Sequence, residues 1–97
     1  MILMYEIMIV DDDAQILDMV GLVLKREGYS VKRAFSARDA LEQVEVNTPD
    51  LFVIDAMMPE MDGISLCRKL RTQPHTSNTP IIFLTGNNNP QNVVDAL

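Results

Sequence analysis

Apolar residues along the 97-residue chain follow two alternating patterns. Short runs of consecutive apolar residues are typical of strands, and stretches with an apolar residue every three or four positions are typical of helices. Such strand-like runs occupy residues 5–10, 29–34, 51–54 and 80–84, and the helix-like stretches occupy residues 16–27, 36–46, 63–71 and 90–97. This βαβαβαβα order predicts an α/β fold, a parallel sheet with helices on both faces.

The predicted strand at 29–34 differs from the other three because it alternates apolar and polar residues and contains Lys32 and Arg33. Basic residues of this kind protect an edge strand from pairing with another chain. In the other three strands, residues 7–10, 51–54 and 81–84 are apolar throughout, as expected for strands buried on both faces. We therefore place the first strand between the second and the third, which gives the strand order 2-1-3-4. This is the flavodoxin-like, doubly wound arrangement, with its switch point between strands one and three.

Local signals indicate where the helices begin and which faces they bury. Ser36 is predicted to cap the second helix, with Asp39 three residues on, and Pro90 suits the first turn of the fourth. Asp13 and Asp62 also occupy positions typical of helix caps. The residues expected to face inward are Ile16, Val20, Val23 and Leu24 in the first helix, Ala37, Ala40, Leu41 and Val44 in the second, and Ile64, Cys67 and Leu70 in the third.

Composition narrows the possible functions. The net charge of −6 argues against a nucleic-acid-binding surface, which would be basic. A single cysteine, Cys67, rules out an internal disulfide, and the lone His75 lies in a polar stretch that is a poor candidate for a metal ligand. Glu6 interrupts the apolar N-terminus, which is too short for a membrane span. We expect a cytoplasmic domain without membrane contact.

Polar residues, most of them acidic, follow the predicted central strands at the points where those strands end. Asp11 and Asp12 follow the first strand, Asp55 the third, and Thr85 the fourth. In an open parallel sheet these ends line one crevice, and neighbouring strands lie only about 4.8 Å apart. Carboxylates packed so closely repel one another unless a cation is present, and hard oxygen ligands suit Mg²⁺. Pro59 disfavours helix just after Asp55, which leaves backbone carbonyls free to act as further ligands.

A single acid at such a junction more often caps a helix than binds a metal. Three acids and a threonine on three adjacent strand ends are harder to explain in that way. The residues alone therefore favour a site for Mg²⁺ and a phosphate group.

The segments "MIVDDD", "VIDAMMPEMDG" and "IIFLTG" resemble, at these spacings, the receiver domain of two-component response regulators. The resemblance implies that Asp55 is the phosphoacceptor, which takes a phosphoryl group from a histidine of a sensor kinase or phosphotransfer protein. It also implies that Asp12 binds Mg²⁺ directly, Asp11 mainly through water, and Met57 through its backbone carbonyl. The hydroxyl of Thr85 would turn toward the new phosphoryl group. Such a domain is a conformational switch rather than a turnover enzyme.

One departure accompanies this resemblance. Receiver domains continue to a fifth strand, which ends in a functional lysine, and to a fifth helix. This chain stops at Leu97, inside the expected fourth helix, and Lys25, Lys32 and Lys69 all lie in other elements. We therefore treat residues 1–97 as an incomplete receiver domain. The apolar fourth strand would form an exposed edge, which predicts self-association.

Two other functions fit parts of the sequence. An apolar strand that ends in Asp-x-Asp, as in "IMIVDDDAQ", also occurs in small phosphatases with an aspartate nucleophile, where Asp11 rather than Asp55 would react. Gln15 departs from the Thr or Val of those enzymes. The third possibility is a degenerate receiver that only binds a partner protein.

Overall fold

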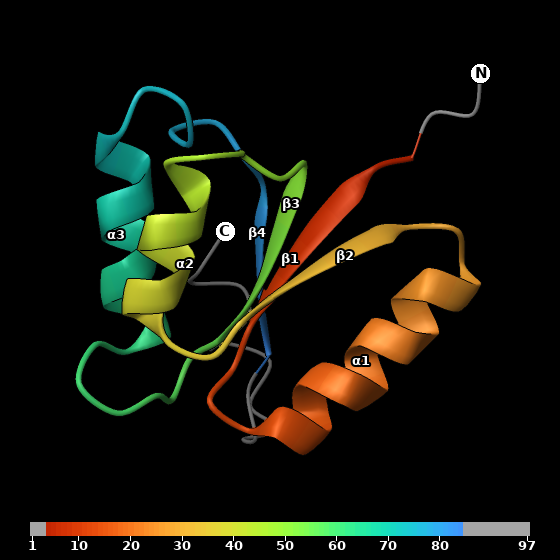
Figure 1. The fold of residues 1–97 in the computed structure, drawn as a ribbon. Coiled ribbons are helices and arrows are strands. Elements are labelled where there is room, and N and C mark those ends of the chain that lie inside the picture. Colours follow the sequence, from red (N-terminus) through yellow and green to blue (C-terminus); the bar gives the residue numbers. More distant parts are fainter. Residues whose placement is uncertain (1–3, 85–97) are drawn as a thin grey trace.

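The computed structural model describes residues 4–84, which form a four-stranded parallel sheet flanked by three helices (Figure 1). The elements are β1 (Glu6–Val10), α1 (Ala14–Arg26), β2 (Ser30–Ala34), α2 (Ala37–Val44), β3 (Leu51–Asp55), α3 (Gly63–Thr72) and β4 (Ile81–Leu84). The predicted helix at 90–97 and the predicted site residue Thr85 lie outside the described residues.

The strand order is β2-β1-β3-β4, and all three pairings are parallel, so the predicted topology is confirmed. β2 forms one edge of the sheet, with Lys32 and Arg33 exposed. The Gln43 side chain on α2 donates a 2.8 Å hydrogen bond from Nε2 to the Arg33 carbonyl oxygen. That bond occupies one of the acceptors that an edge strand otherwise presents to other chains.

The helices cover opposite faces of the sheet: α1 lies on one side, and α2 and α3 lie together on the other (Figure 1). The larger core lies between the sheet and the α2–α3 pair, and α1 packs on β1 and β2 across the sheet. The buried residues of the larger core are Met8, Val10, Ala34, Ala37, Ala40, Val44, Phe52, Ile54, Leu66, Leu70, Ile81 and Phe83.

Some residues predicted to face inward do not. Val23 is 52% exposed and Ile64 is 40% exposed, whereas the fully buried residues of α1 and α3 include Leu17 and Leu66. Both helices carry more apolar residues than one face can bury, so the apolar spacing fits more than one rotation of the helix about its axis. The strand that contains Ile82 was expected to be buried on both faces. Ile82 is nevertheless 45% exposed, because the three described helices do not cover its position.

The predicted helix caps are confirmed. Asp13, Ser36 and Asp62 are the N-caps of α1, α2 and α3, and each side chain accepts a hydrogen bond from a backbone N–H in the first turn. These bonds satisfy amide groups that have no partner within a helix. Gly28 follows α1 with a φ of 95°, a conformation that other residues adopt only at a cost.

The connection from α3 to β4 is held by side chains of α3 and of the connection itself. The buried Thr76 hydroxyl donates a 2.5 Å hydrogen bond to the Leu70 carbonyl oxygen. Nη1 of Arg71 lies within hydrogen-bonding distance of the carbonyl oxygens of Thr76, Ser77 and Thr79. A hydroxyl and a guanidinium thus satisfy backbone acceptors near the end of α3 and orient the chain toward β4.

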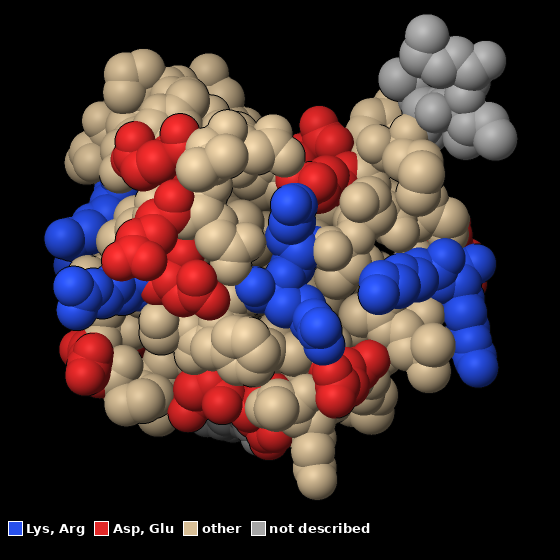
Figure 2. Space-filling model, in the orientation of Figure 1, with Lys and Arg blue, Asp and Glu red and all other residues tan. Residues whose placement is uncertain are grey.

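Charged residues of both signs are interspersed on the surface. Figure 2 shows Lys and Arg side chains in several separate groups, with Asp and Glu side chains near them, rather than gathered into one basic patch on this face. In residues 4–84, no helix is both long and apolar enough to cross a membrane.

Candidate functional site

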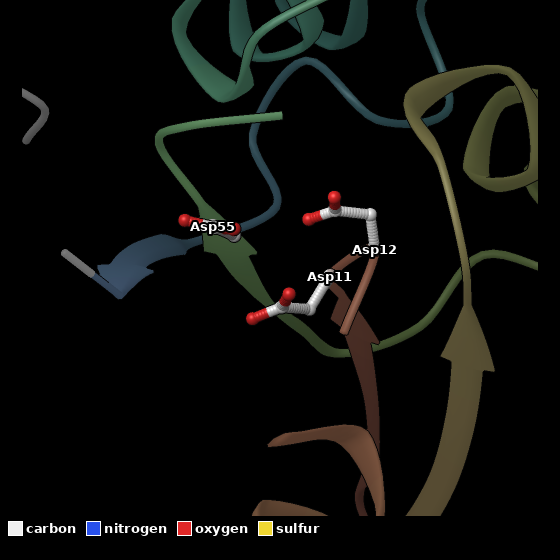
Figure 3. Close-up of side chains that lie close together, drawn as sticks. All are labelled: Asp11, Asp12 and Asp55. Carbon is white, nitrogen blue, oxygen red and sulfur yellow. The ribbon is translucent and has the colours of Figure 1, made fainter. Parts of the chain in front are cut away.

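Three carboxylates meet at the carboxyl edge of the sheet. Asp11 and Asp12 directly follow β1, and Asp55 is the last residue of β3. Each offers a carboxylate oxygen, and these oxygens all lie within 4.8 Å of one another (Figure 3). The parallel pairing of β1 with β3 sets Val10 beside Ile54, so the residues that follow are necessarily neighbours. The sequence prediction that these acids converge is confirmed.

The three carboxylates differ in exposure. Asp11 is only 4% exposed, Asp55 is partly buried, and Asp12 is exposed. Burial raises the pKa of Asp11 above its ordinary value, and the negative charges of Asp55, Asp12 and Asp13 raise it further. The Asp13 N–H opposes this rise in pKa, because it donates a 2.9 Å hydrogen bond to Asp11 Oδ1. The site therefore holds negative charge close together in partly desolvated surroundings.

Asp55 is held in place by the backbone that follows it. The Met57 N–H donates a 3.0 Å hydrogen bond to Asp55 Oδ1. Both main-chain groups of the next residue are fixed, since the Ala56 N–H donates to the Leu84 carbonyl and the Ala56 carbonyl accepts from the Gly63 N–H. β4 and α3 therefore both fix the backbone beside the Asp55 carboxylate.

The loop between Asp55 and α3 contains a tight turn. Glu60 has a φ of 68°, and the Met61 N–H donates a 2.9 Å hydrogen bond to the Pro59 carbonyl. A non-glycine residue in this region of φ carries backbone strain, which persists only where the surroundings enforce it. The loop ends at Asp62, whose carboxylate accepts from the Ser65 N–H, and this bond lowers the pKa of Asp62. Asp62 is thus a helix cap outside the carboxylate cluster.

An open cavity lies beside the carboxylates and has a volume of about 480 Å³. One part of its wall is acidic and the rest is apolar, formed mainly by α1. Its lining residues are Asp11, Asp12, Asp13, Ile16, Met19, Val20, Asp55 and Leu84. The cavity gives a small anionic group access to Asp55 if the negative charge around it is compensated.

The other predicted site residues have mixed outcomes. Met57 has an exposed side chain and orients Asp55 through its N–H, while its carbonyl as a metal ligand stays a prediction. Thr85 follows Leu84 and lies outside the described residues. Sequence reasoning missed the close contact between Gly63 and Asp55, for which the Asp-Gly pair at the start of α3 was the only signal.

The donor set of the cluster fits Mg²⁺. All three donors are carboxylate oxygens, which are hard ligands, and one or two of them suffice for an ion that usually keeps several waters. Burial is the main cause of the raised pKa of Asp11, and repulsion from the neighbouring acids adds to it; a bound cation would offset that repulsion.

Comparison with known proteins identifies the family. Residues 7–97 match the model of the response regulator receiver domain. The chain is 43% identical over 81 residues to the regulatory protein VanR of Enterococcus faecium, covering 84% of this chain and 34% of that protein. It is 40% identical over 80 residues to the transcriptional regulatory protein PhoP of Bacillus subtilis, which regulates alkaline phosphatase synthesis, covering 82% of this chain and 32% of that protein.

Solved structures agree. The N-terminal domain of a response regulator receiver protein from Methanoculleus marisnigri superposes with a TM-score of 0.86 at 34% identity, covering 94% of this chain and 74% of that chain. The chemotaxis protein CheY4 of Vibrio cholerae gives a TM-score of 0.86 at 32% identity, covering 93% and 75%.

The chain therefore belongs to the response regulator receiver domains, the signalling domains of two-component systems. Receiver domains interact with sensor histidine kinases or phosphotransfer proteins, and they typically bind Mg²⁺ through acidic residues. The chain spans about a third of the length of the curated relatives that it matches.

Proposed function

We propose that Asp55 accepts a phosphoryl group from a phosphohistidine of a sensor kinase or phosphotransfer protein, and that the domain then changes conformation. The observation that carries this proposal is the convergence of three carboxylates, with Asp55 as the partly exposed member beside an open cavity. Membership of the receiver family supports it. In this role the chain is a cytoplasmic signalling domain and not a turnover enzyme.

The proposed transfer is a nucleophilic displacement at phosphorus. An oxygen of Asp55 forms the new O–P bond, the N–P bond to the histidine breaks, and the bond's electron pair stays on the imidazole, which then takes up a proton. The hydrogen bond from the Met57 N–H orients the carboxylate for this step. Later attack by water on the acyl phosphate returns Asp55 and releases inorganic phosphate.

Asp55 cannot do this beside two other anions without charge compensation. Asp11, Asp12 and Asp55, together with the Met57 carbonyl, are the residues that we propose to hold Mg²⁺. When bound, the ion supplies positive charge that neutralises the transferring phosphoryl oxygens. The buried Asp11 and the exposed Asp12 would hold the cation together with the phosphoacceptor.

We assign the switch to Thr85. Its hydroxyl would turn toward the phosphoryl group on Asp55 and draw its loop inward, which is a local charge event that biases a two-state element. The hydrogen bond from the Ala56 N–H to the Leu84 carbonyl supports this assignment, because it ties the residue before Thr85 to the residue after Asp55.

The phosphatase alternative, with Asp11 as nucleophile, receives less support. Asp11 is almost fully buried, and burial restricts the approach of a phosphoryl group to its carboxylate compared with the more exposed Asp55. No observation on the described residues favours the partner-binding alternative over the phosphoacceptor.

The experiment that tests the proposal is mapping of the acyl phosphate. The chain is incubated with acetyl phosphate and Mg²⁺, the product is trapped by borohydride reduction, and the modified residue is located by mass spectrometry. We expect modification at Asp55, none in Asp55→Asn, and full modification in Asp62→Asn, which alters an acid outside the cluster. Modification at Asp11 would favour the phosphatase, and none at all would favour the partner-binding domain.

A further inference from the structure

Gly63, the first residue of α3, lies against the backbone that carries Asp55. A methyl group at this position would overlap the Asp55 carbonyl oxygen. It would also lie 2.9 Å from Ile54 Cγ2 and 3.0 Å from Ala56 Cα, and both distances are shorter than ordinary carbon contacts. The start of α3 can approach the end of β3 this closely only because residue 63 has no side chain.

The other glycines of the described chain do not share this property. A methyl group at Gly21, inside α1, would lie 3.7 Å from Val31 Cγ1 and 3.9 Å from Ile9 Cδ1, which are ordinary contacts. Gly28 has open space around it and is required for its positive φ instead. Among the glycines of residues 4–84, close approach to a strand backbone is thus specific to Gly63.

The overlap at Gly63 would be with main-chain atoms, so a change of rotamer cannot relieve it. Either α3 must withdraw, or the Asp55–Ala56 peptide must shift. The Gly63 N–H donates a 3.2 Å hydrogen bond to the Ala56 carbonyl, and the Ala56 N–H donates a 3.1 Å bond to Leu84. The two movements are therefore coupled, and both displace the segment that orients the Asp55 carboxylate.

We infer that Gly63 is a positioning residue for Asp55: the missing side chain lets α3 hold the end of β3 so that the Asp55 carboxylate stays beside Asp11 and Asp12. This inference rests on the proposed function, because it assigns Gly63 a role in the same site. Replacing a residue that orients a metal-binding carboxylate typically lowers the affinity for the metal by about 10- to 100-fold.

The test compares Gly63→Ala with two control variants of the whole chain. Gly21→Ala makes the same substitution in a helix that has room for it. Val44→Ala removes core volume at the last residue of α2. This helix starts near the carboxyl end of β2 and runs back toward the amino ends of the strands, away from the carboxylates. Magnesium affinity is measured by titration, acyl phosphate yield by mass spectrometry, and the free energy of unfolding by urea.

In Gly63→Ala we expect the dissociation constant for Mg²⁺ to rise by at least about tenfold, with a matching fall in acyl phosphate yield. Both controls should keep wild-type affinity, including Val44→Ala, which should be destabilised. Wild-type affinity and yield in Gly63→Ala would overturn the inference, as would an equal loss in Val44→Ala. If Gly63→Ala does not fold in buffer, the same titration in trimethylamine N-oxide, which favours the folded state, decides between these results.

Failure of the proposed function gives a different result, since the unaltered chain would then neither bind Mg²⁺ nor form an acyl phosphate. In that case a crystal structure of Gly63→Ala tests the positioning directly. An Asp55 carboxylate displaced from Asp11 supports the inference, and an unchanged carboxylate overturns it.

Discussion

The carboxylates of Asp11 and Asp55 lie within 4.8 Å of each other at the ends of two neighbouring strands, and Asp11 is almost fully buried. The pKa of Asp11 is raised mainly because burial disfavours its charged form, and Asp55 adds repulsion. At neutral pH such an arrangement lowers the stability of the metal-free fold, because the charged Asp11 carboxylate is less favourable in the folded chain than in the unfolded chain. Carboxyl groups with a pKa shifted by burial and by neighbouring charges are common at functional sites.

The first prediction concerns pH. Because the folded-state pKa of Asp11 is raised, the folded chain binds more protons than the unfolded chain over the window above the ordinary aspartate pKa of about 3.9. Stability contributed by Asp11 is present below that value and is lost as pH rises through its folded pKa. In the absence of metal, Asp11→Asn should therefore raise the free energy of unfolding at pH 7, and the gain should shrink in acid.

Urea unfolding in the presence of EDTA at several pH values measures this gain. Glu45→Gln removes an exposed carboxylate beyond α2 and should have little effect at any pH. A gain for Asp11→Asn that stays constant into acid would contradict the assignment.

The second prediction concerns the cation. A ligand that binds only the folded state at 100 times its dissociation constant stabilises that state by about 2.7 kcal/mol. Mg²⁺ should raise the thermal midpoint of the chain, and the rise should be largely lost in Asp12→Asn and Asp55→Asn. Glu45→Gln makes the same change in net charge and should keep the full rise. An equal rise in all variants would indicate that Mg²⁺ acts through ionic strength alone.

The third prediction concerns the connection after α3. Thr76→Val removes the buried hydroxyl that donates to the Leu70 carbonyl, and an unsatisfied buried acceptor costs about 1–3 kcal/mol. Thr72→Val removes a similar bond to the Lys69 carbonyl at an exposed position, where water replaces it. Urea unfolding should show a clear loss of stability for Thr76→Val only, and equal losses would show that burial does not decide the effect.

The fourth prediction concerns β4. Among the described strands only β3 pairs with it, and Ile82 is 45% exposed on its surface. A polypeptide of these 97 residues should self-associate with rising concentration, and Ile82→Lys should reduce the association because a charge disfavours strand pairing. Size-exclusion chromatography with light scattering measures this, and a stable monomer at high concentration would refute it.

Sequence alone determined the topology and the chemistry of the candidate site. The order of the strands followed from the basic residues of β2, because only an edge strand tolerates them, and the convergence of Asp11, Asp12 and Asp55 followed from strand order. The caps at Ser36 and Asp62 could also be predicted, because a cap is an interaction between residues three positions apart. Each of these features depends on local pattern or on the rule that parallel strands end at one edge.

Only the tertiary structure decided which helical faces are buried and how Asp55 is held. Leu17 and Leu66 are buried in the core, whereas Val23 and Ile64, which the sequence predicted there, are exposed. The reason is that the rotation of a helix about its axis depends on the surface that it packs against. The contact of Gly63 brings the first residue of α3 against the backbone at the end of β3. Periodicity carries no information about such a distance, since it depends on how closely the packed elements approach.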